Sequence, residues 1–157
     1  MKVGLISAGA LVLVAVIFMV DWKGVGESIG LAGNYENMLT RELELKEEAA
    51  DIFASITDVA SAEAAGDRMA KSSTEAVYLE DQISKFKRSK EYSELEEREI
   101  KEKLKARDQA AEAKIRTEMQ RLQSNPSLGP ALAKSVFQAQ QAASNARTEL
   151  MNSKMKN

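Results

Sequence analysis

Apolar side chains recur at helical spacing along most of the chain after residue 34. Met38, Leu45 and Ile52 repeat every seven residues, which places them on one stripe of a helix. We expect this helix to cover about residues 35–57. The stretch SITDVASAEAAGDRM gathers side chains that cap helices and form turns, so the first corner is predicted at residues 58–61.

Three further helices are predicted after this corner. The second covers residues 61–88. Ser93 then precedes Glu96 by three residues, which is the arrangement of a capping box at a helix start. A third helix is therefore expected at residues 93–124. Both prolines of the chain fall in the segment QSNPSLGP, which marks a second corner before a last helix at residues 130–154.

The last predicted helix carries an apolar stripe in which small residues predominate. Its positions alternate in steps of four and three residues, which is the period of a coiled coil. Such a stripe can pack within the chain or against a second copy, and the sequence leaves both open. This candidate packing or partner stripe consists of Leu132, Val136, Ala139, Ala143, Ala146 and Leu150.

Short corners between long helices favour antiparallel neighbours. We therefore predict an all-α fold, with an N-terminal transmembrane helix followed by an antiparallel up-down bundle of three to four long helices. The bundle has three helices if the first helix continues from the membrane as a stalk. In the four-helix arrangement both corners lie at the same end, and Phe53 and Phe137 are expected to share the core.

At the beginning of the chain the apolar residues form a continuous stretch instead of a periodic stripe. Residues 3–20 contain no charged side chain. At about 1.5 Å per residue, a helix of this length spans roughly 27 Å, which is close to the hydrocarbon thickness of a bilayer. We predict a transmembrane signal-anchor over residues 1–22 and a glycine-bearing linker over residues 23–34. The alternative is a signal peptide that is removed after export. The residues assigned to the anchor include Val3, Leu11, Val20 and Trp22.

Charges on the two sides of this segment predict its orientation. Lys2 and the α-amino group lie on one side, whereas Asp21, Lys23 and Glu27 give the other side no positive excess. We therefore expect a single pass through the inner (cytoplasmic) membrane, with residues 35–157 as an extracytoplasmic helical bundle. Membrane lipid is then a partner of the N-terminal helix.

The amino-acid composition argues against several classes of function. The 157 residues include 22 basic and 24 acidic ones, a net charge of −2, which argues against nucleic acid as a partner. Cysteine and histidine are absent, which removes disulfides, thiolate and imidazole metal ligands, and proton transfer by histidine. We expect no catalytic, cofactor-binding or metal-binding residues, no cofactor and no enzymatic activity. The charged stretch over residues 91–107 is interpreted as a solvated helix face.

Two segments resemble those of small exported bacterial helical-bundle proteins. In that group an Ile-x-Asp-x-x-Ser-Ala corner follows the first helix, and an Arg-Leu-x-x-Asn-Pro-x-Leu segment precedes the last. The resemblance implies an exported helical bundle over about residues 50–135, although this chain lacks the cysteine of a lipid-modified leader. The segment YENMLTRE is also similar to the start of LemA-type anchored bundles, whose Leu-Ile-Pro-Asn continuation is missing here. The matching positions of the first resemblance are Ile56, Asp58, Ser61, Ala62, Arg121, Leu122, Asn125, Pro126 and Leu128.

These observations favour a single-pass membrane-anchored structural or interaction protein. We expect an accessory or tethering subunit of an envelope complex, which binds another envelope protein or itself. One alternative is a secreted soluble helical bundle with a cleaved signal peptide. Another is a small-ligand sensor or carrier, which needs an apolar cavity with a few convergent polar groups.

Overall fold

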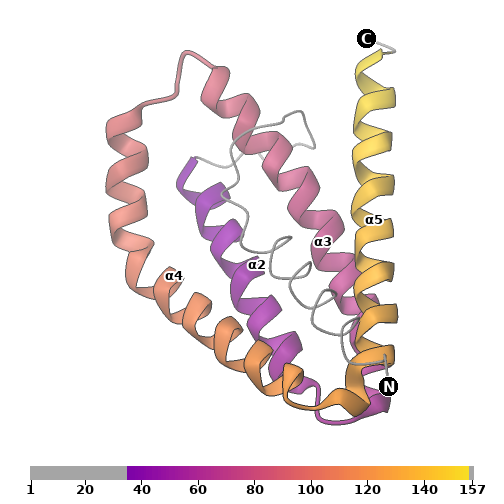
Figure 1. The fold of residues 1–157 in the computed structure, drawn as a ribbon. Coiled ribbons are helices and arrows are strands. Elements are labelled where there is room, and N and C mark those ends of the chain that lie inside the picture. The colour runs from indigo at the N-terminus through magenta and orange to yellow at the C-terminus, as the bar shows by residue number, and fades with distance from the viewer. Residues whose placement is uncertain (1–34, 156–157) are drawn as a thin grey trace.

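The computed structural model describes residues 35–155, which fold into four α-helices (Figure 1). No strand occurs in this range, so the all-α prediction is confirmed for it. The predicted anchor at residues 1–22 and linker at residues 23–34 lie outside the described residues. Within residues 35–155, no helix has an apolar stretch long enough to cross a bilayer. The elements are α2 (Tyr35–Ser55), α3 (Val59–Arg88), α4 (Glu94–Gln123), the 3-10 turn η1 (Pro126–Leu128) and α5 (Gly129–Met155).

The first corner is set by a capping box. Asp58 is the N-cap of α3, and its carboxylate accepts a hydrogen bond from the backbone N–H of Ser61 at 2.7 Å. The Ser61 hydroxyl accepts in turn from the backbone N–H of Asp58 at 2.9 Å, which completes the box. Because Asp58 takes the cap position, α3 begins at Val59, two residues before the predicted start. α2 ends at Ser55, two residues before its predicted end.

The ends of α4 also carry local signals. Ser93 is the N-cap of α4, and its hydroxyl accepts a hydrogen bond from the backbone N–H of Glu96 at 3.4 Å. After α4, Pro126 begins the 3-10 turn, where its fixed φ suits a first helical position. The guanidinium of Arg121 donates to the backbone carbonyl of Phe53 at 2.9 Å. This hydrogen bond ties the second corner to the end of α2.

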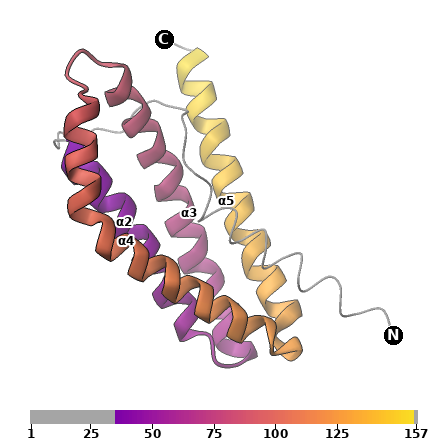
Figure 2. The same ribbon diagram turned by 60° about the vertical axis from the view of Figure 1, so that its left-hand side comes forward.

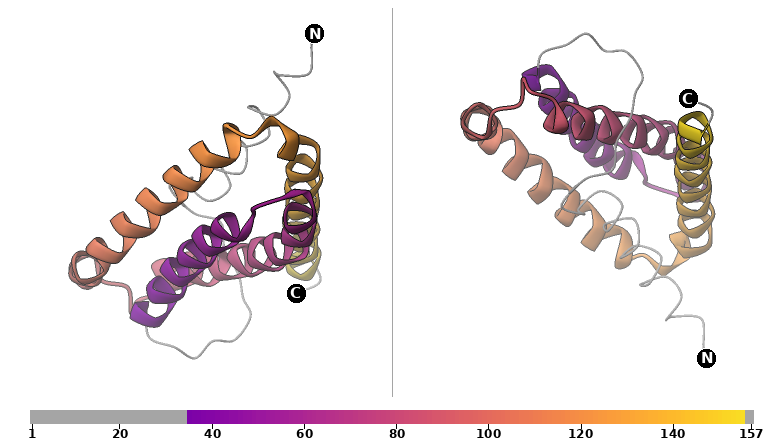
Figure 3. Two further views of the ribbon diagram at one scale, coloured as in Figure 1. Left: turned by 90° about the horizontal axis from the view of Figure 1, so that it is seen from below. Right: turned by 90° about the horizontal axis from the view of Figure 1, so that it is seen from above.

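Contacts between the helices place them in the order α4, α2, α3, α5 (Figure 1), and Figure 3 shows the same arrangement from below and from above. α2 and α3 run antiparallel, as expected for helices joined by a short corner. α4 packs on α2, and α5 packs on α3 in the most extensive contact of all. Both of these pairs are parallel, because α3–α5 contacts advance together from Glu63 with Lys134 to Tyr78 with Glu149, and α2–α4 contacts advance in the same way. The two parallel contacts join helices that are not consecutive, and the consecutive helices α2 and α3 pack antiparallel, as expected.

α2 has a neighbour on two sides because it carries apolar residues on two sides. Ile52 and Phe53 are adjacent in sequence and therefore point about 100° apart around the helix, yet both are buried. A single antiparallel neighbour cannot cover both directions. α3 lies on one side of α2 and α4 on another.

The main core lies at the end of the molecule where both corners meet (Figure 2). All four helices and η1 contribute to one cluster of buried residues there. Toward the other end the core divides into a cluster between α2, α3 and α4 and a smaller cluster between α3 and α5. The helices are thus held together most completely at the corners.

Phe53 and Phe137 do not share this core. Phe53 is 1% exposed and belongs to the main core, whereas Phe137 is 64% exposed. The prediction that both rings pack in the interior is therefore wrong for Phe137. Val136 of α5 is buried, and the next position is turned about 100° away from it, toward a side of α5 that no described helix covers.

The contact between α3 and α5 depends on a glycine. A Cβ atom on Gly66 would overlap with Oε1 of Gln138 and would lie 3.2 Å from Oγ of Ser135. The Ser135 hydroxyl donates to the backbone carbonyl of Ala62 at 2.6 Å, so the two helices approach closely enough for a direct hydrogen bond to the backbone. Gly66 is thus a point of close packing inside α3.

Candidate binding groove

A half-open cavity of about 840 Å³ lies between α2, α3 and α4. We call it the groove. Its lining residues on α4 extend from Glu97 to Glu112, a distance of roughly 22 Å at the rise of an α-helix. The groove is therefore elongated along α4. Its apolar lining consists of Leu39, Leu43, Leu45, Ala76, Leu79, Ile83 and Leu104.

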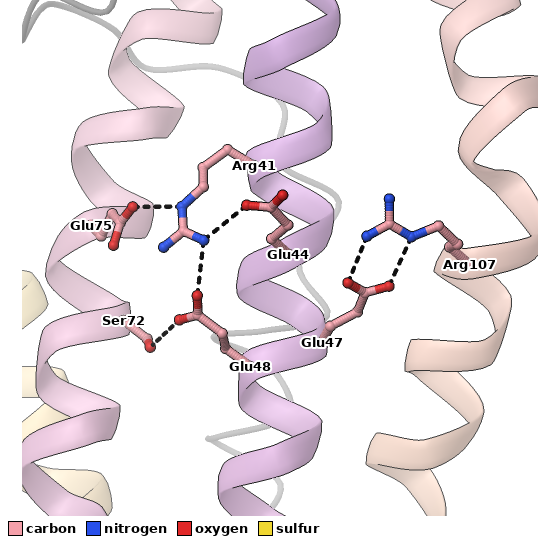
Figure 4. Close-up of polar contacts among 7 residues, drawn as sticks. All are labelled: Arg41, Glu44, Glu47, Glu48, Ser72, Glu75 and Arg107. Atoms are coloured by element: carbon pink, nitrogen blue, oxygen red, sulfur yellow. Dashed lines mark hydrogen bonds and ion pairs between the residues drawn. The ribbon is translucent and has the colours of Figure 1, made fainter.

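Ion pairs outside the groove hold α2 between its two neighbours. The guanidinium of Arg41 contacts Glu75 of α3 at 2.7 Å and Glu48 of its own helix at 2.8 Å (Figure 4). On the α4 side, the carboxylate of Glu47 accepts two hydrogen bonds from Arg107, at 3.0 and 2.7 Å (Figure 4). These pairs are partly exposed and add little to stability individually, but the paired geometry with Arg107 fixes the orientation of α4 on α2.

Lys46 joins α2 to α4 along the groove. Its ammonium group lies 2.5 Å from a carboxylate oxygen of Asp108 and 3.3 Å from one of Glu112. Burial lowers the pKa of Lys46, but the hydrogen bonds from its ammonium group to these two carboxylates outweigh the burial and raise it. Lys46 therefore stays charged, and both carboxylates form ion pairs with it.

The carboxylate of Glu97, beside the groove, interacts with three donor groups. Its carboxylate accepts hydrogen bonds from Lys87 at 2.9 Å and from the hydroxyl of Tyr92 at 2.5 Å, and it lies 2.8 Å from the ammonium group of Lys101. Burial opposes ionisation here, but these three interactions prevail and lower the pKa of Glu97 to about 2. The hydrogen bond to Glu97 in turn raises the pKa of Tyr92 to about 12. Glu97 is thus ionised at neutral pH.

An aromatic cluster adjoins Glu97. The ring of Tyr35, at the start of α2, is stacked on Phe86 of α3 with a centroid distance of 4.9 Å. The ring of Tyr92, in the connection between α3 and α4, is nearly perpendicular to that of Tyr35, with a centroid distance of 5.9 Å. These contacts pack three separate segments against one another. They anchor the first turn of α2 beside the groove.

Three charged residues that line the groove have no ion pair among the described residues: Glu42, Glu80 and Arg98. Burial raises the pKa of Glu42, and the charges of Lys46, Lys101 and Lys87 only partly offset this. Burial also raises the pKa of Glu80. Both carboxylates share the groove lining with apolar side chains, which include Leu43 on α2 and Leu79 on α3.

The candidate stripe on α5 is turned mostly inward. Five of its six residues are buried, and Leu150 is partly buried in the small cluster between α3 and α5. The structure therefore shows these residues packed within one chain. The anchor residues Val3, Leu11, Val20 and Trp22 lie outside the described range. Within the described range, no group of three or more metal-ligating side chains is assembled.

The groove is not evident from the sequence. Most positions of the charged stretch over residues 91–107 are exposed, as predicted for a solvated face, but Glu97 is 7% exposed and Ile100 is 2% exposed. Acidic residues and leucines alternate over residues 42–45 of α2, and this alternation is a local signal of apolar side chains next to charged ones. It shows that α2 has no continuous solvent face, but not which helices surround it.

Comparison with known proteins gives no assignment. No protein-family model matches the chain, and neither a curated protein nor a solved structure matches it.

Proposed function

We propose that the protein is a single-pass membrane-anchored interaction protein, an accessory or tethering subunit of an envelope complex. In this proposal the groove binds a helical segment of the partner. Residues 1–22 hold the chain in the inner membrane, and the helical domain lies on the extracytoplasmic side. The observation that supports the binding role is the half-open cavity between α2, α3 and α4, with its apolar lining and charged edges.

The shape of the groove supports a helix as its occupant. An amphipathic helix docks by inserting a row of side chains at positions i, i+3 or i+4, and i+7 into an apolar groove. The groove extends roughly 22 Å along α4, which matches about four turns of such a helix. Its charged edges suit the polar flanks of an amphipathic helix. We propose binding rather than catalysis, because a chain without histidine and cysteine lacks the side chains most used for proton transfer and nucleophilic attack.

Site-specific photo-crosslinking in cells tests this role. A photoreactive residue is placed at Leu43 or Ile83 in the groove, or at the exposed Leu95 on α4 as the control. We expect the groove positions to capture one helical segment that the control position does not capture. That segment, made as a synthetic peptide, should bind the purified full chain and should lose binding to an Ile83→Arg variant. Equal capture from all three positions, or a peptide that binds the variant as well, would contradict the proposal.

A second candidate function is a small-ligand sensor or carrier. The volume of the groove, about 840 Å³, falls within the range of about 300–1,000 Å³ that is typical of ligand pockets. The elongated shape and half-open form favour a helix instead. Co-purification of a stoichiometric small apolar molecule, displaced by bulky substitutions at Leu43, would favour the ligand-binding role.

A further inference from the structure

The charged lining of the groove is mostly paired. It includes six acidic and five basic side chains. Lys46 is shared by Asp108 and Glu112. The other pairs are Glu97 with Lys87 and Lys101, and Glu102 with Lys105.

The lining residues left without an ion pair are two carboxylates, Glu42 and Glu80, and one cation, Arg98. The two carboxylates come from adjacent helices, α2 and α3, and lie among the apolar side chains. Arg98 is an exposed residue of α4, which forms the other wall of the groove. The apolar part of the groove therefore contains two carboxylates without a direct ion pair, whose charge is only partly offset by cations farther away.

We infer that the groove selects a helical partner that carries a lysine or arginine beside its apolar face, and that Glu42 receives this cation. The inference rests on the proposed function, because it names the chemistry of the proposed occupant. Glu42 is the stronger of the two carboxylate candidates, because Glu80 also faces Arg147 of α5.

The selection follows from desolvation. A helix laid in the groove removes water from Glu42, and an ionised carboxylate that loses water without gaining a partner is costly. The nearby lysines do not remove this cost, because Lys46, Lys87 and Lys101 already contact other carboxylates. A partner that brings its own cation compensates the charge, whereas a neutral or acidic partner leaves it uncompensated.

Designed peptides test the inference directly. Three amphipathic helices of about 16 residues share one leucine stripe and differ at a single flanking position, which is lysine, glutamine or glutamate. Binding to the full chain in detergent is measured by fluorescence anisotropy, for the wild-type protein and for Glu42→Gln. Glu36→Gln, on the same helix but outside the groove, serves as the matched control. Circular dichroism confirms that each variant is folded.

We expect the lysine peptide to bind the wild-type protein about ten-fold more tightly than the glutamine peptide, and the glutamate peptide to bind most weakly. Glu42→Gln should remove most of this preference, and Glu36→Gln should keep it. If the three peptides bind the wild-type protein equally, the inference is overturned while the proposed helix-binding role stands. If the preference persists in Glu42→Gln, the assignment to Glu42 is overturned. If no peptide binds the folded wild-type protein, the proposed function is overturned as well.

Discussion

At the scale of single residues, Glu97 illustrates how one buried carboxylate joins separate segments. Its partners come from α3 (Lys87), from the connection before α4 (Tyr92) and from α4 itself (Lys101). Hydrogen bonds to a charged group contribute more to stability than hydrogen bonds between neutral groups. A buried charged group that lacks them destabilises the fold. Helix spacing accounts for only one of the three contacts, the pair four residues apart on α4, because the other two depend on tertiary packing.

Replacing Glu97 with glutamine should lower the free energy of unfolding at neutral pH by about 1–3 kcal/mol. The pKa of Glu97 is about 2 in the folded protein against an ordinary value of 4.5, so its ionisation stabilises the fold above about pH 4.5. This contribution is lost as the pH falls from about 4.5 toward about 2. Urea unfolding should therefore show a smaller difference between wild type and Glu97→Gln at about pH 3 than at pH 7. An equal difference at both pH values would contradict this account of Glu97.

The two phenylalanines in contrasting environments give a second prediction. Phe53→Ala should destabilise the protein by about 3–5 kcal/mol, because it leaves a cavity in the main core. Phe137→Ala should change stability by less than about 0.5 kcal/mol, because that ring is largely exposed. Thermal or urea unfolding of both variants measures the contrast. Comparable losses would mean that Phe137 is covered.

At the scale of elements, local signals in the sequence predict much of each helix and little of the pairing. Asp58 and Ser93 act as N-caps close to where the sequence places helix starts, because a cap is a contact between residues a few positions apart. Packing of α4 on α2 brings together residues more than sixty positions apart, such as Lys46 and Asp108. Apolar periodicity identifies the buried stripe of a helix, but it does not name the helix that covers it.

The close approach of α3 and α5 predicts different results for two substitutions at Gly66. A leucine has no room against Gln138 and Ser135, and Gly66→Leu should destabilise the protein by about 1–3 kcal/mol. Gly66→Ala displaces the flexible end of Gln138 and shifts the Ser135 hydroxyl slightly, but it gains helix propensity of about 1 kcal/mol, so its net effect should be within about 0.5 kcal/mol of zero. Chemical unfolding distinguishes the two variants. A neutral Gly66→Leu would show that the two helices do not approach this closely.

At the scale of the whole molecule, the order α4, α2, α3, α5 creates the groove. α2 contacts both α3 and α4 along its length, and the cavity occupies the space that these three helices share. The sequence could not predict this cavity, because a half-open space depends on how three helices diverge. The sequence does not single out Glu42 for the same reason, since the role of an acidic residue on a helix depends on the side chains that surround it in the fold.

The proposed anchor predicts how the natural protein behaves in cells. The chain should remain with the membrane fraction and resist extraction at high pH, because residues 3–20 are uncharged and long enough to span the bilayer. Mass spectrometry of the purified protein should show an intact N-terminal segment. A soluble protein whose sequence begins near Glu27 or Gly33 would favour the secreted alternative instead.

The most direct test of the central claim is methyl NMR of the full chain in detergent, titrated with the lysine-bearing leucine-stripe peptide. The account predicts shifts in the methyl signals of Leu43, Ile83 and Leu104, which line the groove. The methyl signals of Leu132 and Val136, in the contact between α3 and α5, should stay in place. Shifts confined to the α3–α5 contact, or no shifts at saturating peptide, would contradict the claim that the groove between α2, α3 and α4 is the binding surface.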